Sequence, residues 1–155
     1  LEKKVFEAHP ALKRQSRRMT PVAWNDSFSI WDDELDEHHK QLIRYIRVLS
    51  DPEERKRHDP NVIPMLVKGL VDYSSYHFAA EEKRMRESGY PDLAAHVAAH
   101  QDFSKDVAIF GQTFSQGSPR LERVLLAYLT DWLTTHILTS DKKLGEFLKA
   151  RRQRG

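Results

Sequence analysis

The placement of histidine in this chain points to metal chemistry. Six of its eight histidines lie in four short motifs, and five of the six, together with two carboxylates of the same motifs, are candidate ligands. The motifs are Asp36-Glu37-His38-His39-Lys40, His77-Phe78-Ala79-Ala80-Glu81, His96-Val97-Ala98-Ala99-His100, and His136 followed five residues later by Asp141. Imidazole-rich sites with a few carboxylates suit iron, copper or zinc rather than magnesium or calcium. Five imidazoles and two acids are too many ligands for one ion and about right for two.

Each motif falls within a different stretch of helical periodicity, on the apolar side of that stretch. A single histidine in such a position is more often a hydrogen-bonded core residue than a ligand. Burying all of these groups without a metal would leave many of them unpaired, at a cost of about 1–3 kcal/mol each. Coordination would satisfy them together, so the pattern as a whole predicts a metal site.

Four helices are predicted to carry the motifs. The first runs from about Asp33 to Leu49, the second starts near Asn61, the third starts near Leu93, and the fourth opens at Pro119. Gly89 is a predicted C-cap of the second helix, and residues 116–119 break the third. Short connections favour antiparallel neighbours, so we expect an all-α, up-down-up-down four-helix bundle. Residues 1–23 read as a basic arm or linker, 24–150 as the bundle, and 151–155 as a basic tail.

Composition narrows the class of protein. The 155 residues fit one domain, and the net charge of +2 does not by itself call for a polyanionic partner. The absence of cysteine excludes disulfides, thiolate zinc sites and iron–sulfur clusters and is compatible with a cytoplasmic location, which we expect. No apolar run approaches the roughly 20 residues of a membrane span, so we expect no membrane insertion. Because the chain does not start with Met, we expect a trimmed chain or a domain of a longer protein.

The spacing of the last motif predicts a distorted helix. His77 and Glu81 share a helix face, as do His96 and His100, because residues four apart lie above one another. Residues five apart, such as His136 and Asp141, differ by about 140° on a regular α-helix. The apolar pattern beyond this point improves if the register shifts by one residue, because Leu144 and Leu148 then continue the inner face. We therefore predict a π-bulge between His136 and Asp141.

The order His, His-x3-Glu, His-x3-His, His-x4-Asp resembles the hemerythrin family, specifically its bacterial domains. Tyr76-His77-Phe78 with Glu81-Glu82, Tyr90-Pro91 before His96, and Trp132-Leu133 before His136-Ile137 are similar to that family as well. The similarity runs from roughly Trp24 to Leu148. One departure is Trp31, followed by Asp32, where relatives usually have Gly and an aliphatic residue. This departure concerns the start of the first helix and not the ligands.

The resemblance implies an oxo- or hydroxo-bridged pair of irons that binds O2 reversibly, without haem. The ligands it implies are His39, His77, Glu81, His96, His100, His136 and Asp141. Three histidines would saturate one iron, and His39 with His77 would leave the other open. If both ions are octahedral and both acids bridge, one of twelve coordination positions stays vacant. Candidate walls of the O2 pocket are Phe78, Trp132, Leu133 and Ile137, whose apolar surfaces would keep out water and protons.

His38 and Glu82 are adjacent in sequence to predicted ligands but are not expected to bind the metal. Helical phase places His39 inward with Leu35 and Leu42, so His38 is expected to be partly exposed or to support a ligand. Alanine at His77 should abolish O2 binding, and alanine at His38 should not. Glu82 follows a ligand on its helix and is expected to be a solvated acid pointing away.

Functions other than O2 carriage, storage or sensing fit these motifs less well. A diiron enzyme of the ferritin type would need four carboxylates and Glu-x-x-His pairs, which the ligand motifs lack, although peroxide or nitric oxide chemistry stays possible. Structural zinc needs only four ligands. The basic arm and Arg151-Arg152-Gln153-Arg154 could join a fused or docked signalling domain, while nucleic-acid binding is not expected because no groove-reading element accompanies them. We expect a non-enzymatic protein.

Overall fold

The computed structural model describes residues 22–59, 63–114 and 119–154. Within these ranges it describes every side chain except those of residues 63, 110–114 and 119–122. In these ranges the chain is helical and contains no strand. A short 3-10 helix, η2, precedes the long helices. The elements are η2 (Asp26–Phe28), α2 (Asp33–Ser50), α3 (Pro52–Lys56), α4 (Ile63–Ser88), α5 (Leu93–Phe114), α6 (Pro119–His136), a π-helical segment (Ile137–Asp141) and α7 (Lys142–Arg154).

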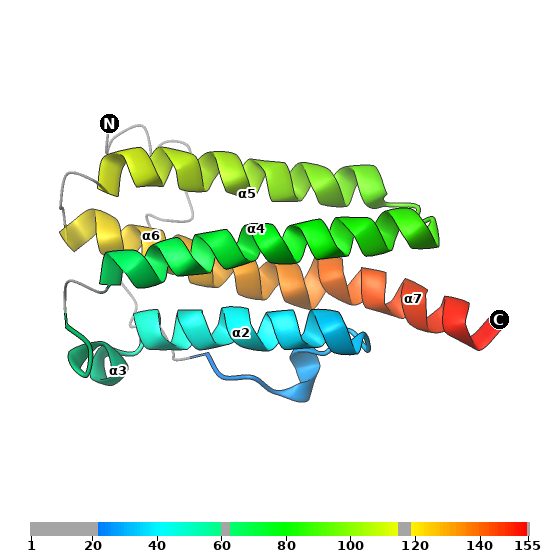
Figure 1. Ribbon diagram of the computed structural model, residues 1–155, viewed down its shortest axis with the longest axis horizontal. Coiled ribbons are helices and arrows are strands. Elements are labelled where there is room, and N and C mark those ends of the chain that lie inside the picture. Colours follow the sequence, from blue (N-terminus) through cyan, green and yellow to red (C-terminus); the bar gives the residue numbers. More distant parts are fainter. Residues whose placement is uncertain (1–21, 60–62, 115–118, 155) are drawn as a thin grey trace.

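The long helices form an antiparallel bundle. Figure 1 shows α2 and α5 running one way and α4 and the α6–α7 pair running the other. Helix α2 packs against α4 and α6, and α5 packs against the same two helices from the opposite corner. This arrangement confirms the predicted all-α, up-down-up-down bundle, whose fourth member consists of α6 and α7 joined through the π-helical segment.

Local sequence explains where the helices begin and end. The Asp32 carboxylate accepts a hydrogen bond from the backbone N–H of Leu35, which caps α2, and acids fill the first turn. The Asp51 carboxylate caps α3 in the same way. Gly89 ends α4 with a φ of 67°, the left-handed conformation that glycine adopts without strain, as predicted. The proline at the start of α3 makes the charged connection a short helix rather than a plain loop.

Trp31, two residues before α2, adopts a left-handed backbone conformation. It has a φ of 59°, the conformation for which a glycine is favoured. Its ring lies beneath two ammonium groups, with Lys142 Nζ 4.2 Å and Lys149 Nζ 4.6 Å from the ring centroid. Its carbonyl accepts a hydrogen bond from Arg152. These contacts from α7 offset the backbone strain, and α2 begins normally at Asp33.

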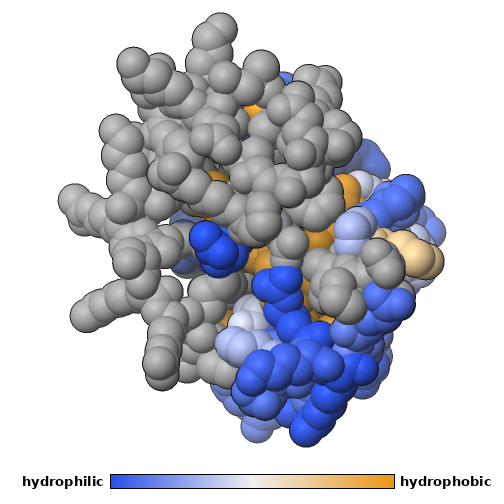
Figure 2. Space-filling view, turned by 90° about the vertical axis from the view of Figure 1, so that its left-hand side faces the viewer, coloured by the Kyte–Doolittle hydropathy of each residue, from blue (hydrophilic) through white to orange (hydrophobic). Residues whose placement is uncertain are grey.

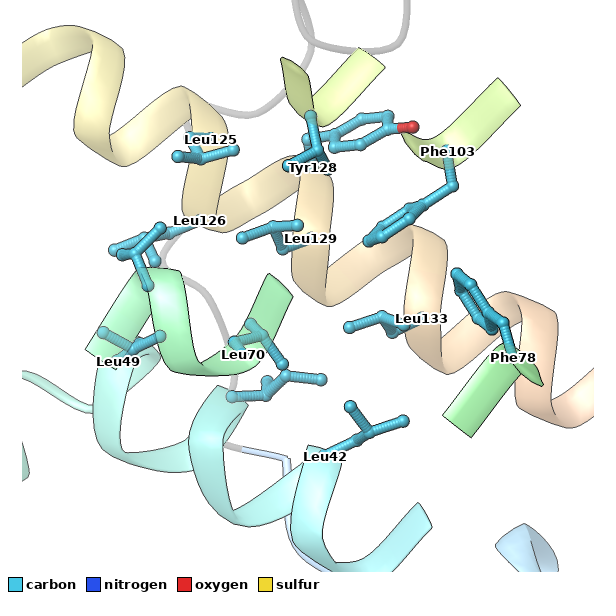
Figure 3. Packing of buried hydrophobic residues seen from close by; sticks show 13 residues of the cluster. Leu42, Leu49, Leu70, Phe78, Phe103, Leu125, Leu126, Tyr128, Leu129 and Leu133 are labelled. Atoms are coloured by element: carbon cyan, nitrogen blue, oxygen red, sulfur yellow. The ribbon is translucent and has the colours of Figure 1, made fainter. Parts of the chain in front are cut away.

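The core has two main apolar clusters at different heights along the bundle. Figure 3 shows the larger one, in which side chains of α2, α4, α5 and α6 converge. Leu42, Leu70, Phe103 and Leu129 are among its most buried members. The second cluster joins the start of α2, the end of α4 and α7. Its buried members are Ile30, Leu35, Met85, Tyr90, Leu144 and Leu148.

Close approach of α7 to the segment before α2 depends on a glycine. A Cβ atom at Gly145 would lie 2.3 Å from the carbonyl oxygen of Ile30 and 2.7 Å from its Cβ. On the same segment, Asp36 accepts hydrogen bonds from the backbone N–H of Ile30 and the hydroxyl of Ser29. Lys142 donates to the Ser29 carbonyl. These contacts fix the fourth helix against the first.

The two ends of the described chain differ: the first residues pack against the core, and the last ones extend α7. Of the basic arm predicted for residues 1–23, positions 1–21 lie outside the described residues. Val22 and Trp24 pack against the core. Helix α7 continues through the predicted tail to Arg154. Figure 2 looks onto the end of the bundle near α3, where the described residues are mostly hydrophilic. In the described part of the chain, no helix is long and apolar enough to cross a membrane.

Candidate metal centre

The bundle brings all seven predicted ligands into one buried cluster between the two apolar clusters. They form two groups that share Glu81 and Asp141. Within each group the potential ligand atoms all lie within 4.8 Å of one another. The three-histidine group is Glu81, His96, His100, His136 and Asp141, and the two-histidine group is His39, His77, Glu81 and Asp141. Every member is buried, and His39, Glu81 and Asp141 have no exposed surface.

Each helix of the bundle contributes to the cluster. His39 comes from α2, whereas α4 and α5 each contribute a pair of residues four apart, which project from one face. Apolar residues one or two turns away on the same faces, such as Leu35 and Leu42 beside His39, are buried in the two core clusters. Packing of these apolar residues therefore orients the ligand candidates toward the bundle axis.

The π-helical segment brings the last two ligand candidates together. The backbone N–H of Lys142 donates to the carbonyl of Ile137, five residues earlier, which confirms the predicted π-bulge. As a result His136 Nε2 lies 3.0 Å from Asp141 Oδ1. Beyond the bulge, Leu144 and Leu148 are buried, as the shifted register predicts.

The spacing of the imidazole nitrogens suits octahedral coordination. His136 Nε2 lies 3.0 Å from the Nε2 atoms of both His96 and His100, and the Nε2 atoms of His39 and His77 are 3.2 Å apart. With metal–nitrogen bonds of about 2.1 Å, neighbouring ligands at right angles would be about 3.0 Å apart, against about 3.4 Å in a tetrahedron. The distances from His136 to His96 and to His100 therefore equal the spacing of neighbouring octahedral ligands.

The two carboxylates place negative charge at the centre of the cluster. Burial and the nearby Asp141 raise the pKa of Glu81, but the surrounding histidines outweigh both and lower that pKa to about 2. Burial also raises the pKa of Asp141, yet His136 and the other imidazoles lower it well below its usual range. Both groups are therefore ionised at neutral pH.

These buried carboxylates lack ordinary hydrogen bonds. None of their four oxygens has a hydrogen-bond partner, although imidazole nitrogens lie 3.0–3.9 Å away. Unpaired buried anions are costly, and a cation placed among nitrogens and oxygens that point to a common centre would remove that cost. The residues present thus fit two cations, one in each group, and Glu81 and Asp141 would be shared between them.

Glu82 is a neighbour of the cluster that helical phase along α4 does not reveal. It was expected to be a solvated acid, but its Oε1 atom lies 3.1 Å from Nδ1 of His100, and its side chain is only 22% exposed. Its separation from His77 by five residues on α4 gave no sign of this contact, because the partner comes from α5. His38 is buried rather than partly exposed, with its ring edge-on to that of His77 at 5.8 Å.

The four predicted pocket residues lie on different sides of the cluster. Phe78 stacks on the His100 ring with centroids 3.9 Å apart, and Trp132 stacks on His136 at 4.4 Å. Both therefore flank the three-histidine group. Leu133 shares the large cluster with Leu42, and Ile137 packs in a small cluster with Phe28 and Ile43. Since Leu42 and Ile43 follow His39 on α2, these two residues line the α2 side of the bundle.

Comparison with known proteins agrees with this geometry. The family model described as the hemerythrin HHE cation binding domain matches residues 32–148. A bacteriohemerythrin of Stenotrophomonas maltophilia is 31% identical over 132 residues, covering 85% of this chain and 84% of that protein. A myohemerythrin of Sipunculus nudus is 31% identical over 123 residues, covering 79% of this chain and 90% of that protein. With the family model spanning the bundle from the cap of α2 to the buried part of α7, the chain belongs to the hemerythrin family.

Proposed function

We propose that this chain binds O2 reversibly at a non-haem pair of iron ions. In this proposal His96, His100 and His136 hold one iron, and His39 and His77 hold the other. Glu81 and Asp141, which belong to both groups, would be shared by the two irons, and an oxo or hydroxo group would complete the bridge. A nitrogen-rich set with two carboxylates is suited to iron. When bound, the iron pair supplies the electrons for reversible O2 binding, and the chain supplies the ligands and a dry cavity.

The inequality of the two ligand groups is the observation that carries the proposal. Both groups share two carboxylates, but one has three histidines and the other has two. If both ions are octahedral, the two-histidine side is one ligand short, and that position is available to a small molecule. The relatives that match over most of the chain are named bacteriohemerythrin and myohemerythrin, which supports the same assignment.

The surroundings of the cluster support binding rather than turnover. Apolar clusters lie on both sides of it along the bundle, and Leu133 and Ile137 are each 1% exposed. An apolar surrounding excludes water and protons, which would otherwise release reduced oxygen and leave the irons oxidised. Phe78 and Trp132 extend the apolar surrounding over the three-histidine group, because each covers the face of one of its imidazoles, whereas Leu133 and Ile137 lie on the α2 side. The proposal is therefore a non-enzymatic O2 carrier, store or sensor, and a cytoplasmic location and a signalling partner remain predictions.

Iron analysis combined with optical spectroscopy tests the proposal. The full chain should contain two irons, and the reduced protein should gain colour in air and lose it when O2 is removed, over repeated cycles. His77→Ala should abolish the reversible change, because it removes one of the two histidines on the open side. The matched control is His58→Ala, since His58 lies beyond α3, away from the cluster. His38→Ala is a poorer control because that ring contacts His77.

Two outcomes would contradict the proposal. One is a protein with a single iron per chain after loading with excess iron. The other is rapid irreversible oxidation accompanied by turnover of a substrate such as peroxide, which would favour a diiron enzyme instead.

A further inference from the structure

Glu82 connects the ligand cluster to the outer face of α4. Its Oε1 atom accepts the Nδ1–H of His100 at 3.1 Å when Nε2 faces the cluster. Its other oxygen, Oε2, lies 3.4 Å from Nη1 of Arg86, one turn later on the same helix. A carboxylate on the far nitrogen of a ligand histidine fixes its tautomer, holds the ring in place and makes it a stronger base toward a metal.

The ring of His100 is also fixed from its face. Phe78 lies parallel to it, with an interplanar angle of 10°. His136, in the same group, is covered by Trp132 at an interplanar angle of 12°. Two of the three histidines in the three-histidine group are thus held by stacked aromatic rings, and one is also held by a carboxylate.

The two-histidine group has no comparable support in the described part of the chain. The Nδ1 atoms of His39 and His77 are buried and have no hydrogen-bond partner there. The nearest aromatic neighbours of His77 are tilted or edge-on, as with Phe78 at 51° and His38 at 88°. These rings therefore rely on helix packing alone for their orientation.

We propose that the three-histidine group holds its iron more tightly than the two-histidine group, and that Glu82 is the positioning residue that makes it so through His100. This inference rests on the proposed pair of irons but not on O2 binding. It implies that the centre loses its irons in sequence, the one on the two-histidine side first. Removing a carboxylate behind a ligand histidine typically weakens metal binding about 10- to 100-fold.

Iron release from the loaded full chain tests this inference. The ferrous protein is mixed with excess of a strong Fe(II) chelator, and the coloured complex is followed over time. The parent protein should release iron in two phases of equal size. Glu82→Ala should accelerate the slow phase by about 10- to 100-fold and leave the fast phase unchanged. Glu82→Gln, which keeps an acceptor oxygen of similar reach, should restore most of the slow release.

Controls assign the phases and separate this effect from loss of fold. His77→Ala should remove the fast phase and leave one slowly released iron. Glu87→Ala is the matched control, since Glu87 lies on the same helix, is 60% exposed and forms an ion pair with Lys83 at 3.9 Å on the helix surface. Its release should equal that of the parent. Far-ultraviolet circular dichroism of each variant checks that helix content is kept, and if Glu82→Ala loses it, the Gln variant alone is compared with the parent.

The results that would overturn the inference are distinct from those that would overturn O2 binding. Unchanged slow release in folded Glu82→Ala, or acceleration of the fast phase instead, would refute the role of Glu82. If only the Gln variant folds, slow release modestly faster than that of the parent supports the role of Glu82, because a neutral amide oxygen accepts a weaker hydrogen bond than a carboxylate. Slow release equal to that of the parent refutes it. Two-phase release from a protein with no reversible O2 spectrum would refute the proposed function and leave this inference standing.

Discussion

His136 and Asp141 are five residues apart, yet Nε2 of the histidine lies 3.0 Å from Oδ1 of the aspartate. A regular α-helix would place these side chains about 140° apart. The π-helical segment Ile137–Asp141 absorbs one extra residue, so that both face the cluster and α7 continues with its apolar side inward. The same bulge therefore brings the last predicted ligand into the cluster and sets the register of the last helix.

Deletions on either side of Asp141 should have opposite effects on stability. Deleting exposed Thr139 removes the extra residue, so a regular helix would still place Leu144 and Leu148 inward. Deleting exposed Lys143 would rotate both leucines by about 100° out of the second core cluster. We expect the midpoint of urea unfolding to be kept in the first variant and strongly lowered in the second. Equal losses in both variants would contradict the role given to the bulge.

Substitution by alanine should lower the stability of the protein at Gly145 but not at Gly69. A Cβ at Gly145 would meet backbone atoms of Ile30, which cannot move aside, so we expect Gly145→Ala to cost about 1–3 kcal/mol of unfolding free energy. At Gly69 the nearest atoms belong to the end of the Tyr45 side chain, at 3.0 Å. That ring can shift, and alanine favours a helix by about 1 kcal/mol over glycine. Denaturant unfolding should therefore show Gly69→Ala to be at least as stable as the parent.

The energetic cost of the left-handed backbone at Trp31 can be measured by comparing the stability of two variants. Trp31→Ala and Trp31→Gly both remove the ring from Lys142 and Lys149. Only glycine also relieves the positive φ of 59°, which costs other residues about 1–2 kcal/mol. We expect the Gly variant to be more stable than the Ala variant by about 1 kcal/mol in urea unfolding. A more stable Ala variant would mean that the backbone is not strained there.

Leu133 and Leu129 form a matched pair for the proposed O2 pocket. Both are fully buried in the large core cluster on α6, one turn apart, and Leu133 is nearer to His136 in the chain. Each change to alanine should cost about 2–5 kcal/mol of stability. Only Leu133→Ala should also accelerate oxidation of the O2-bound protein, because it opens a path for water to the cluster. The measurement is the decay of the O2-dependent absorption, and equal rates in both variants would remove Leu133 from the pocket wall.

The sequence was sufficient for features that depend on spacing along one helix. The i,i+4 pairs His77–Glu81 and His96–His100, the glycine that ends α4 and the bulge before Asp141 all follow from helical periodicity and apolar phase. These features are local, because each residue's direction is fixed by the turn on which it lies. Periodicity also identified the buried face of each helix, and hence the bundle.

Contacts between helices were decided only by the tertiary structure. Glu82 points about 100° away from Glu81 on α4, and it meets a ligand only because α5 places His100 beside it. His38 is buried because Tyr73 and Tyr76 of α4 pack against its ring. Trp31 is tolerated in a glycine conformation because α7 supplies two lysines and an arginine around it. Helical phase determines where a side chain points, but which partner it meets depends on how neighbouring helices are packed.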